Sequence, residues 1–455
     1  MGKMARKIRK GLNLPITGVP RPGDVPFESA KTVKTVAITG FDYNGMKPTM
    51  KVNEGDEVKI GQPLFECKKT PGVTYTSPGA GKVKAINRGK RRIFQTLVID
   101  LDNQEQHVEF ENFKEGRLNL SREEVVDLLV ESGMWTALTK RPFSKIPEID
   151  SKPFALFINA MDTHPLALDP SFVIQDYQED FSQGVEILSK LTDGKTFVVK
   201  KKGMPLNLEQ NSKIRIEEFS GMHPAGNVGT HMHFLSPVSQ KRVNWSINYQ
   251  DVIAVGKLFK TGKLFLERSI SLGGPLAKNP RYLKTRLGAN INEALEGEAK
   301  TDKNTRIVSG SVFNGRKVEA PFEFLGRYHN QVVFLEEGIQ REFLGWQSPG
   351  FDKFSVKSVF LSKFMPGKKF NMNTNKNGSL RSIVPVGAYE KVMPMDILAT
   401  HLLRSLAAKD TDSAQELGCL ELDEEDISLF TFVCPSKIDH APLLRENLEI
   451  IEKEG

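Results

Sequence analysis

The first quarter of the chain alternates short apolar and polar stretches that glycine and proline turns separate. Residues 1–35 have the pattern of an extended arm, and the alternation covers residues 36–108. Its stretches are VAITG, MKVNEGDEVKI, PLFECK, VTYTSP, GKVKAI and FQTLVIDLD. Short strands at this spacing predict a compact β-barrel or sandwich.

Residues 109–250 change to alternating strands and helices. SREEVVDLLVESG predicts a helix, because Ser121 can cap its start, Glu124 completes a capping box and Gly133 stands where a helix ends. FALFINAM and TFVVKK are typical of buried strands, and QEDFSQGVEILSKL is typical of a helix between them. This order predicts an α/β layer.

The remaining chain divides into three parts, which makes the fold class α+β and multidomain. Residues 251–330 predict strands, a turn and one short helix, and residues 331–380 predict a β extension. Residues 381–455 become helical from position 394. Two sets of apolar residues have the spacing of one helix face: Leu398, Leu402 and Leu406, and then Leu444, Leu448 and Ile451.

The composition is that of soluble domains. The 455 residues suffice for roughly three domains of ~150 residues each. The longest apolar run, FALFINAM, is much shorter than the ~18 residues of a membrane span, and the basic start MGKMARKIRK lacks the apolar core of a secretory signal. Cys67, Cys419 and Cys434 are too sparse for a disulfide framework or an iron–sulfur cluster. We expect a soluble or peripheral protein of the cytoplasm.

The chain is basic, with a net charge of +7. Nucleic-acid binding is disfavoured, because no helix-turn-helix, zinc finger or aromatic RNA-binding signature accompanies the charge. Two other interpretations remain open. The lysines and arginines form an ordinary solvated surface, or they attract an anionic membrane leaflet or an acidic partner.

Histidines cluster once, in GMHPAGNVGTHMHFL. A strand here would point His231 and His233 to one face, with His223 nearby. Three imidazoles are enough for a zinc site. The favoured alternative is a packed loop anchored by glycines, because no cysteine or carboxylate stands at ligand spacing. An unusual loop of this kind also suits a binding surface.

A second candidate loop, NAMDTHPLALDP, directly follows a predicted strand of the α/β layer. Loops at the carboxyl ends of such strands commonly bind ligands. Asp162, Thr163 and His164 are its polar candidates, and a simple turn capped by Asp162 is the competing interpretation. The sequence shows no catalytic triad and no complete phosphate-binding loop, so it predicts no catalytic residue.

Several longer motifs resemble a known family. They are KKTPGV, SPGAGKV, NAMDTHPLALDP, HPAGNVGTHMHFL, SLGGPLAKNPRYLKTRLGAN and LGCLELDEEDISLFTFVCPSKIDH. Together they resemble the A subunits of bacterial Na+-translocating NADH:quinone reductases (Na+-NQR), over nearly the whole chain. The family is also similar to the C subunit of the Rnf complex and to the flavin subunit of respiratory complex I.

The resemblance implies a peripheral subunit on the cytoplasmic face of the inner membrane, with five other subunits as partners. The complex moves electrons from NADH through FAD, FMN and iron centres to ubiquinone and exports Na+. The resemblance further implies a biotinyl/lipoyl-like barrel-sandwich, a Rossmann-like α/β domain, an SLBB-like β-grasp domain and a degenerate ferredoxin-like helical segment.

Three of these modules, the α/β domain, the ferredoxin-like segment and the barrel-sandwich, lack residues that their chemistry needs. Relatives bind FMN with glycines where this chain has Met134, Trp135, Thr136 and Leu138, and only glycines let backbone N–H groups close on a phosphate. The Rnf-type cluster motif keeps Cys434 with Pro435. The three other ligand positions are occupied by Glu424, Ile427 and Phe430. We therefore expect this chain to bind no cofactor of its own.

A carrier lysine is the remaining possibility. The hairpin LFECKKTPGVTYTSP carries Lys68 and Lys69 beside Pro71, whereas carrier domains usually place one lysine alone at the tip. We expect a retained fold without its cofactor. A biotinyl/lipoyl carrier protein and an Rnf-type electron-transfer subunit stay as alternatives to a structural subunit. In that structural subunit, residues 159–170 and 221–235, including His233, are the predicted contacts with quinone or a partner.

Overall fold

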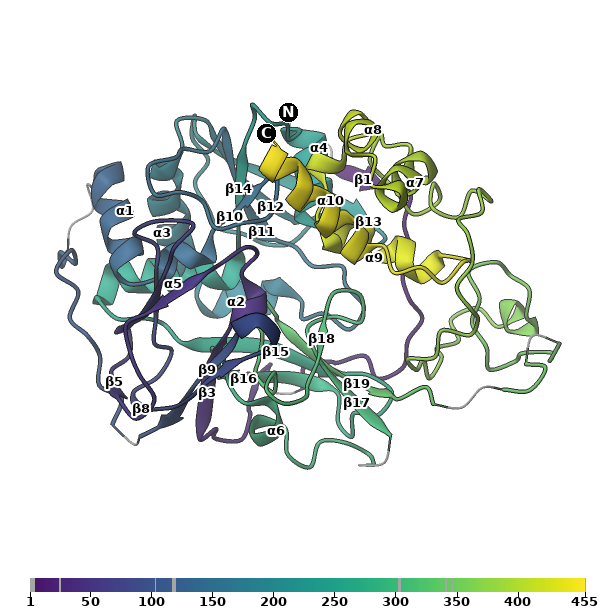
Figure 1. The fold of residues 1–455 in the computed structure, drawn as a ribbon, viewed down its shortest axis with the longest axis horizontal. Helices are drawn as coiled ribbons and strands as arrows, with labels where there is room; N and C mark the ends of the chain where they lie inside the picture. The colour runs from purple at the N-terminus through teal and green to yellow at the C-terminus, as the bar shows by residue number, and fades with distance from the viewer. Residues whose placement is uncertain are drawn as a thin grey trace.

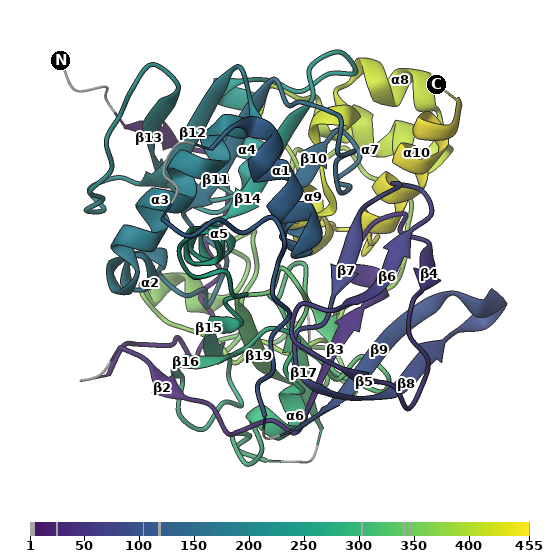
Figure 2. The same cartoon turned by 90° about the vertical axis from the view of Figure 1, so that its left-hand side faces the viewer.

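The computed structural model describes residues 5–23, 26–102, 104–116, 120–301, 304–339, 342–345 and 347–454. Four sheets and a group of C-terminal helices pack into one body (Figure 1). Seen from the side, the strands of residues 35–101 form a separate layer beside the α/β layer, and the C-terminal helices cover one end (Figure 2).

The N-terminal part is the barrel-sandwich that the strand pattern predicts. One antiparallel sheet has the order β3-β9-β8-β5 and the other has the order β4-β6-β7. The strands are β3 Thr35–Thr39, β4 Pro48–Met50, β5 Glu57–Val58, β6 Pro63–Cys67, β7 Thr74–Thr76, β8 Gly81–Arg88 and β9 Phe94–Leu101. Alternate residues such as Leu97 and Ile99 are fully buried, as expected for strands with one face on the core.

The α/β part contains a six-stranded sheet in the order β1-β13-β12-β11-β14-β10. Its strands are β1 Arg6–Ile8, β10 Thr139–Arg141, β11 Ala155–Ala160, β12 Lys195–Lys201, β13 Ile214–Gly221 and β14 Asn244–Asn248. All neighbours run parallel except β10. Leu156 and Ile158 of β11 lie in one core cluster and Phe157 lies in another, so both faces of the sheet are covered.

Helices lie on both faces of this sheet: α1 Arg122–Glu131, α2 Pro170–Asp176, α3 Gln178–Leu188, α4 Val228–Leu235 and α5 Tyr249–Thr261. Helix α1 begins with the predicted capping box, since Ser121 accepts from the Glu124 N–H and Glu124 accepts from the Ser121 N–H. Helices α3 and α5 approach closely. A Cβ at Gly256 would lie 1.9 Å from the Asp180 carbonyl oxygen, so only glycine fits there.

The predicted strand at the start of residues 251–330 is wrong, because this stretch is helix α5. Asn248 caps the helix by accepting from the Gln250 N–H, and Gly262 ends it with φ 69°. The helix is buried nearly all round, and its apolar run contains Val252, Ile253 and Val255. A fully buried run of β-branched residues has no helical periodicity, which is why the pattern resembled a strand.

The next part forms a second six-stranded sheet in the order β18-β17-β19-β15-β16-β2. The strands are β2 Glu28–Ser29, β15 Glu267–Gly273, β16 Arg281–Arg286, β17 Thr305–Ser309, β18 Arg316–Lys317 and β19 Gln331–Glu336. The predicted short helix is α6 Ile291–Ala294. The predicted β extension is wrong beyond β19: the described residues that follow, up to the C-terminal helices, contain only the short helix η5 Leu361–Phe364.

The C-terminal helices have a core of their own. They are α7 Ala399–Ala408, α8 Thr411–Glu416, α9 Glu424–Val433 and α10 Ala441–Glu454. Leu444, Leu448 and Ile451 are buried on one face of α10, as their spacing predicts. Leu398 does not share the buried face of α7, because it precedes the helix and is 63% exposed.

The N-terminal arm ties these parts together. Its β1 extends the α/β sheet, and the Leu12 N–H donates to the His223 carbonyl. Ile16 then bridges to Phe370, and β2 pairs with β16 in the second large sheet. The arm therefore contributes strand hydrogen bonds to two separate sheets.

Candidate functional site at the junction with the C-terminal helices

The two loops that the sequence singles out meet in space. The rings of His164 and His223 lie 4.7 Å apart between centroids. Thr163 Oγ1 is 3.2 Å from His223 Nδ1 and accepts from the Gly226 N–H at 2.8 Å. The loop after β11 and the loop after β13 therefore join at the carboxyl edge of the parallel sheet, as expected for strands of one α/β layer.

The other two histidines point elsewhere. Residues 228–235 form helix α4 and not a strand, so His231 and His233 do not share a face. His231 Nε2 lies 2.8 Å from the Ala225 carbonyl oxygen. His233 Nδ1 lies 3.0 Å from Glu421 Oε2, and its Nε2 accepts from the Asp396 N–H.

These positions do not form a metal site. Within the described residues, no three His, Cys, Asp or Glu side chains are grouped as metal ligands would be. His223 and His231 have no exposed surface. Burial lowers the pKa of His231 to about 4, and burial together with the nearby His164 lowers the pKa of His223 well below 6.5. Both imidazoles are therefore neutral at pH 7.

His164 has the opposite electrostatic setting, because two carboxylates face its ring. Nδ1 is 2.8 Å from Asp162 Oδ1, and Nε2 is 3.3 Å from Glu425 Oε1 of helix α9. Burial alone would lower its pKa, but Asp162 and then Glu425 outweigh this effect and raise the pKa to about 9. The protonated ring therefore links the β11 loop to the C-terminal helices.

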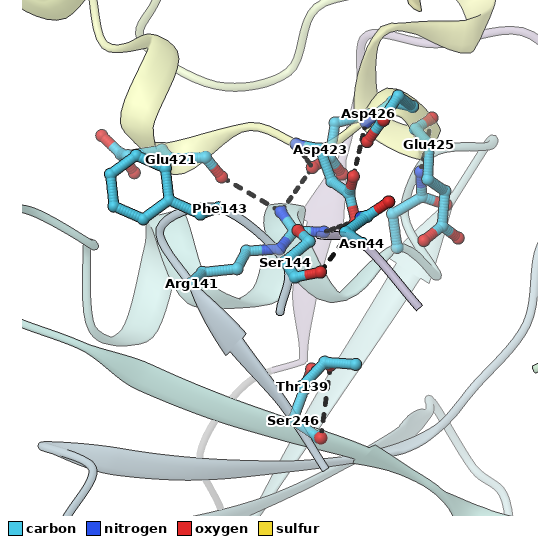
Figure 3. A network of polar contacts seen from close by, with 12 residues as sticks. Asn44, Thr139, Arg141, Phe143, Ser144, Ser246, Glu421, Asp423, Glu425 and Asp426 are labelled. Carbon is cyan, nitrogen blue, oxygen red and sulfur yellow. Dashed lines mark hydrogen bonds and ion pairs between the residues drawn. The ribbon is translucent and has the colours of Figure 1, made fainter. Parts of the chain in front are cut away.

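A buried ion pair lies beside this histidine. Arg141, the last residue of β10, places Nη1 2.5 Å from Asp426 Oδ2 and 3.0 Å from the Glu421 carbonyl oxygen (Figure 3). Arg141 is 2% exposed and Asp426 is 5% exposed. Helix α4 makes room for the pair, since a Cβ at Gly229 would lie 2.4 Å from Arg141 Nη1.

The turn after Arg141 connects further parts of the molecule. The Phe143 carbonyl accepts from Arg445 Nη1 of helix α10, and the Ser144 carbonyl accepts from Asn44 Nδ2 of the barrel-sandwich. Lys145 pairs with Glu452, also on α10. The junction of three parts of the chain therefore centres on this turn.

Sequence reasoning missed the arginines of this junction. Arg141 stands in TKRPFS beside Lys140, where two basic residues in an exposed-looking stretch give no signal of burial. The acidic run Asp423–Asp426 was a usable signal, because carboxylates are favoured at a helix N-terminus and a buried carboxylate needs a cationic partner. Asp423 and Asp426 form the capping box of α9, and Asp426 is also the partner of Arg141.

The chain matches three family models along most of its length. They are described as the NqrA N-terminal barrel-sandwich hybrid domain (residues 6–102), the NqrA second alpha/beta domain (residues 120–264) and the NQRA C-terminal domain (residues 269–320). The A subunit of the Na(+)-translocating NADH-quinone reductase of Hahella chejuensis is 53% identical, over 99% of this chain and 100% of that protein. The chain belongs to the NqrA family, the A subunits of Na(+)-translocating NADH-quinone reductases.

Other relatives of the same name support this assignment. Those of Saccharophagus degradans and Neisseria meningitidis serogroup B are 53% and 51% identical, each over 99% of this chain and 100% of the relative. Among solved structures, an NAD+-reducing [NiFe]-hydrogenase in its H2-reduced state aligns with a TM-score of 0.34 and 10% identity, covering 48% of this chain and 47% of that one. A likeness this weak does not establish a shared fold.

In this member of the NqrA family, packed side chains occupy two of the places at which the sequence was compared with a flavin loop and an iron–sulfur motif. Trp135, at a position where the resemblance to FMN-binding Rnf and complex I subunits leads us to expect glycine, is fully buried and donates to the Pro147 carbonyl from Nε1. Ile427 and Phe430 lie in the core of the C-terminal helices, and Cys434 Sγ is 3.1 Å from the Tyr389 hydroxyl. The described part of the chain contains no helix with the length and apolarity to cross a bilayer.

The exposed hairpin tip is different. Lys68 and Lys69 are both exposed, whereas the preceding Cys67 is buried in the barrel-sandwich. A surface lysine is chemically open to modification. The absence of a carrier cofactor on Lys68 or Lys69 therefore stays a prediction.

Arg141→Met should lower the free energy of unfolding by about 3–5 kcal/mol, because it leaves Asp426 buried without its cation. Chemical denaturation followed by far-UV circular dichroism measures the change. The double variant Arg141→Met with Asp426→Leu should be less destabilised than Arg141→Met. Lys84→Met is the control: it removes a half-exposed pair with Asp100 and should cost less than about 1 kcal/mol. A single Arg141→Met variant as stable as the control contradicts the prediction.

His164→Gln should destabilise the protein in a pH-dependent way. Folding raises the pKa of His164 from 6.5 to about 9, so the folded state favours the protonated ring. The stabilisation is complete below about pH 6.5 and is lost as the pH rises through about 9. The difference in unfolding free energy between the two proteins should therefore shrink across this window. Asp162→Asn should reduce the same pH dependence, and a difference that stays constant with pH would contradict the assignment.

Proposed function

We propose that this chain is the peripheral A subunit of a Na+-translocating NADH:ubiquinone reductase, which couples electron transfer from NADH to ubiquinone to Na+ export. The observation that carries the proposal is its identity of 51–53% to relatives of that name, over their whole length. Its role is structural: it is one subunit of the oxidoreductase complex, without a catalytic site of its own.

The partners are five other subunits, and the chain sits on the cytoplasmic face of the bacterial inner membrane. NADH, FAD, FMN and the iron centres belong to those other subunits, and nucleic acid is not a partner. The packed side chains Trp135, Ile427 and Phe430 support this division, because they fill positions that a flavin phosphate or a cluster ligand would need.

We base the assignment of two individual domains on the same family resemblance. The parallel strands β11, β12, β13 and β14, covered by helices on both faces, are consistent with a Rossmann-like α/β domain. The C-terminal helical domain, residues 381–455, contains a degenerate ferredoxin-like segment. Its apolar core now supplies the stabilisation that a bound cluster would supply in a metalloprotein.

The predicted site residues serve this structural role by joining the α/β domain to the C-terminal helices. His164 contacts Glu425 of α9, and His233 contacts Glu421 just before it. Asp162 holds the His164 ring, and Thr163 holds His223. The junction fixes how the C-terminal helices are presented to neighbouring subunits.

Affinity co-purification of the tagged chain from its own membranes in mild detergent tests the proposal. The eluate should contain five companion subunits and Na+-stimulated NADH:quinone reductase activity. A chain recovered alone and inactive would contradict it. Intact mass of the same sample adds a second readout, because an added cofactor on Lys68 or Lys69 would favour a carrier protein instead.

Direct quinone contact by the imidazoles is a separate prediction. A quinone site needs hydrogen-bond donors beside an apolar slot, and His223 and His231 are buried, so ubiquinone could reach them only if the junction opens. His164→Gln and His223→Gln complexes should then reduce quinone more slowly, while NADH oxidation by an artificial electron acceptor stays unchanged.

The exposed His401→Gln in α7 is the matched control for these two variants. Unchanged quinone reduction in an intact complex would exclude the contact and leave the junction with its structural role alone.

A further inference from the structure

Residues 347–386 form the least buried part of the described chain, and we name them the apolar–basic extension. They lie between β19 and α7 and project as yellow-green loops at the right of the molecule (Figure 1). Of these 40 residues, only Gly350 and Phe370 are buried. A segment that buries so little gains little stability from its own packing.

The extension exposes large apolar side chains. Nine of the nineteen such side chains that are exposed in the described residues belong to it. They are Phe351, Val356, Val359, Leu361, Phe364, Met365, Leu380, Val384 and Val386. Single exposed apolar residues need no explanation, but a concentration of this kind marks a surface that contacts another molecule or a membrane.

The same residues hold most of the net charge of the protein. The extension has seven basic residues and one acidic residue, Asp352, so it carries +6 of the chain's +7. The basic residues are Lys353, Lys357, Lys363, Lys368, Lys369, Lys376 and Arg381. The partner of this surface should therefore be negatively charged.

A hollow of about 250 Å³ lies within the extension. The residues that line it include Ser355, Ser358, Ser362, Lys363 and Lys368. Hydroxyl and ammonium groups donate hydrogen bonds, and phosphate oxygens accept them. Apolar side chains line the same hollow, so it offers polar donors and apolar surface side by side: Phe354, Val359, Phe360 and Met365.

Several contacts hold the extension on the body of the protein, and two of them involve its phenylalanines. Phe370 bridges to Ile16 of the N-terminal arm, and the Phe354 ring stacks at 6.4 Å from that of Phe432 on α9. The extension is therefore fixed at its base while Phe364, at 71% exposed, and Val359, at 68%, face outward.

We propose that the apolar–basic extension binds the surface of an anionic phospholipid bilayer. Its apolar side chains enter the boundary between headgroups and acyl chains, and its lysines pair with lipid phosphates. Lysine is depleted in protein–protein interfaces, whereas lysines with exposed phenylalanines are typical of membrane-surface segments. The inference deepens the proposed peripheral role and rests on it for its biological setting.

Co-sedimentation of the purified full-length chain with vesicles tests the proposal. The chain should bind vesicles of phosphatidylcholine mixed equally with phosphatidylglycerol and should bind pure phosphatidylcholine much more weakly. Each lysine near an anionic surface strengthens binding roughly fivefold, so Lys357, Lys363 and Lys369 changed together to Gln should weaken it roughly 100-fold. Changing Phe351 and Phe364 to Ser should weaken it by roughly tenfold or more.

Matched control variants change equally exposed residues outside the extension. Lys34, Lys82 and Lys202 changed to Gln, and Phe41 and Phe154 changed to Ser, should each leave vesicle binding within about twofold of the parent chain. Circular dichroism of every variant verifies that it is folded. Inorganic phosphate should release no more of the bound chain than sodium chloride of the same ionic strength, because both salts screen the lysines and a single phosphate does not replace the apolar contacts.

Three results would overturn the proposal. They are no binding to either vesicle, equal loss in the control variants, and release by inorganic phosphate that far exceeds release by sodium chloride of the same ionic strength. If vesicles are not bound but the variants fail to co-purify with the membrane subunits, the surface is a protein interface instead. Vesicle co-sedimentation uses the isolated chain and tests only the membrane-binding proposal. The activity of the co-purified complex tests the proposed function, so failure of one is distinguishable from failure of the other.

Discussion

The arrangement of the C-terminal helices depends on one buried ion pair, Arg141 with Asp426. Neither side chain can return to water while the helices stay docked, and each would be costly to bury without the other. Such a pair adds little net stability compared with an apolar contact of the same shape, but it penalises every docking in which the two charges do not meet. The pair therefore defines the position of α9 relative to β10 more than it strengthens the contact.

The surrounding contacts support this position from several sides. Gly229 lets α4 approach the pair, and His164 adds a cation between Asp162 and Glu425. Arg445 reaches from α10 to the carbonyl of the turn that follows Arg141. Polar side chains thus join two parts of the chain whose cores are separate, alongside Phe143 and Phe313, which pack against the core of the C-terminal helices. Networks of this kind require all their members to be satisfied together.

Features set by local patterns could be predicted from the sequence. The capping box of Ser121 and Glu124 and the buried strand β11 follow from spacing alone, and the structure confirms them. Helix α5 could not be predicted in this way, since burial on all sides removes the periodicity that distinguishes a helix. The loop of residues 159–170 was found because it follows a predicted strand, and the loop of residues 221–235 was found by its cluster of histidines. Their partner Arg141 was not found, because its pairing with Asp426 spans 285 residues and no local signal encodes it.

Hydrogen–deuterium exchange of the Arg141→Met variant tests the central claim most directly. The account predicts faster exchange in α9 and α10, residues 424–433 and 441–454, with α1 and α3 as protected as in the parent protein. The loss should be local, because the helices have their own core and would undock rather than unfold the α/β domain. Unchanged protection of α9 and α10 in a folded variant would contradict the claim that the buried pair holds the junction.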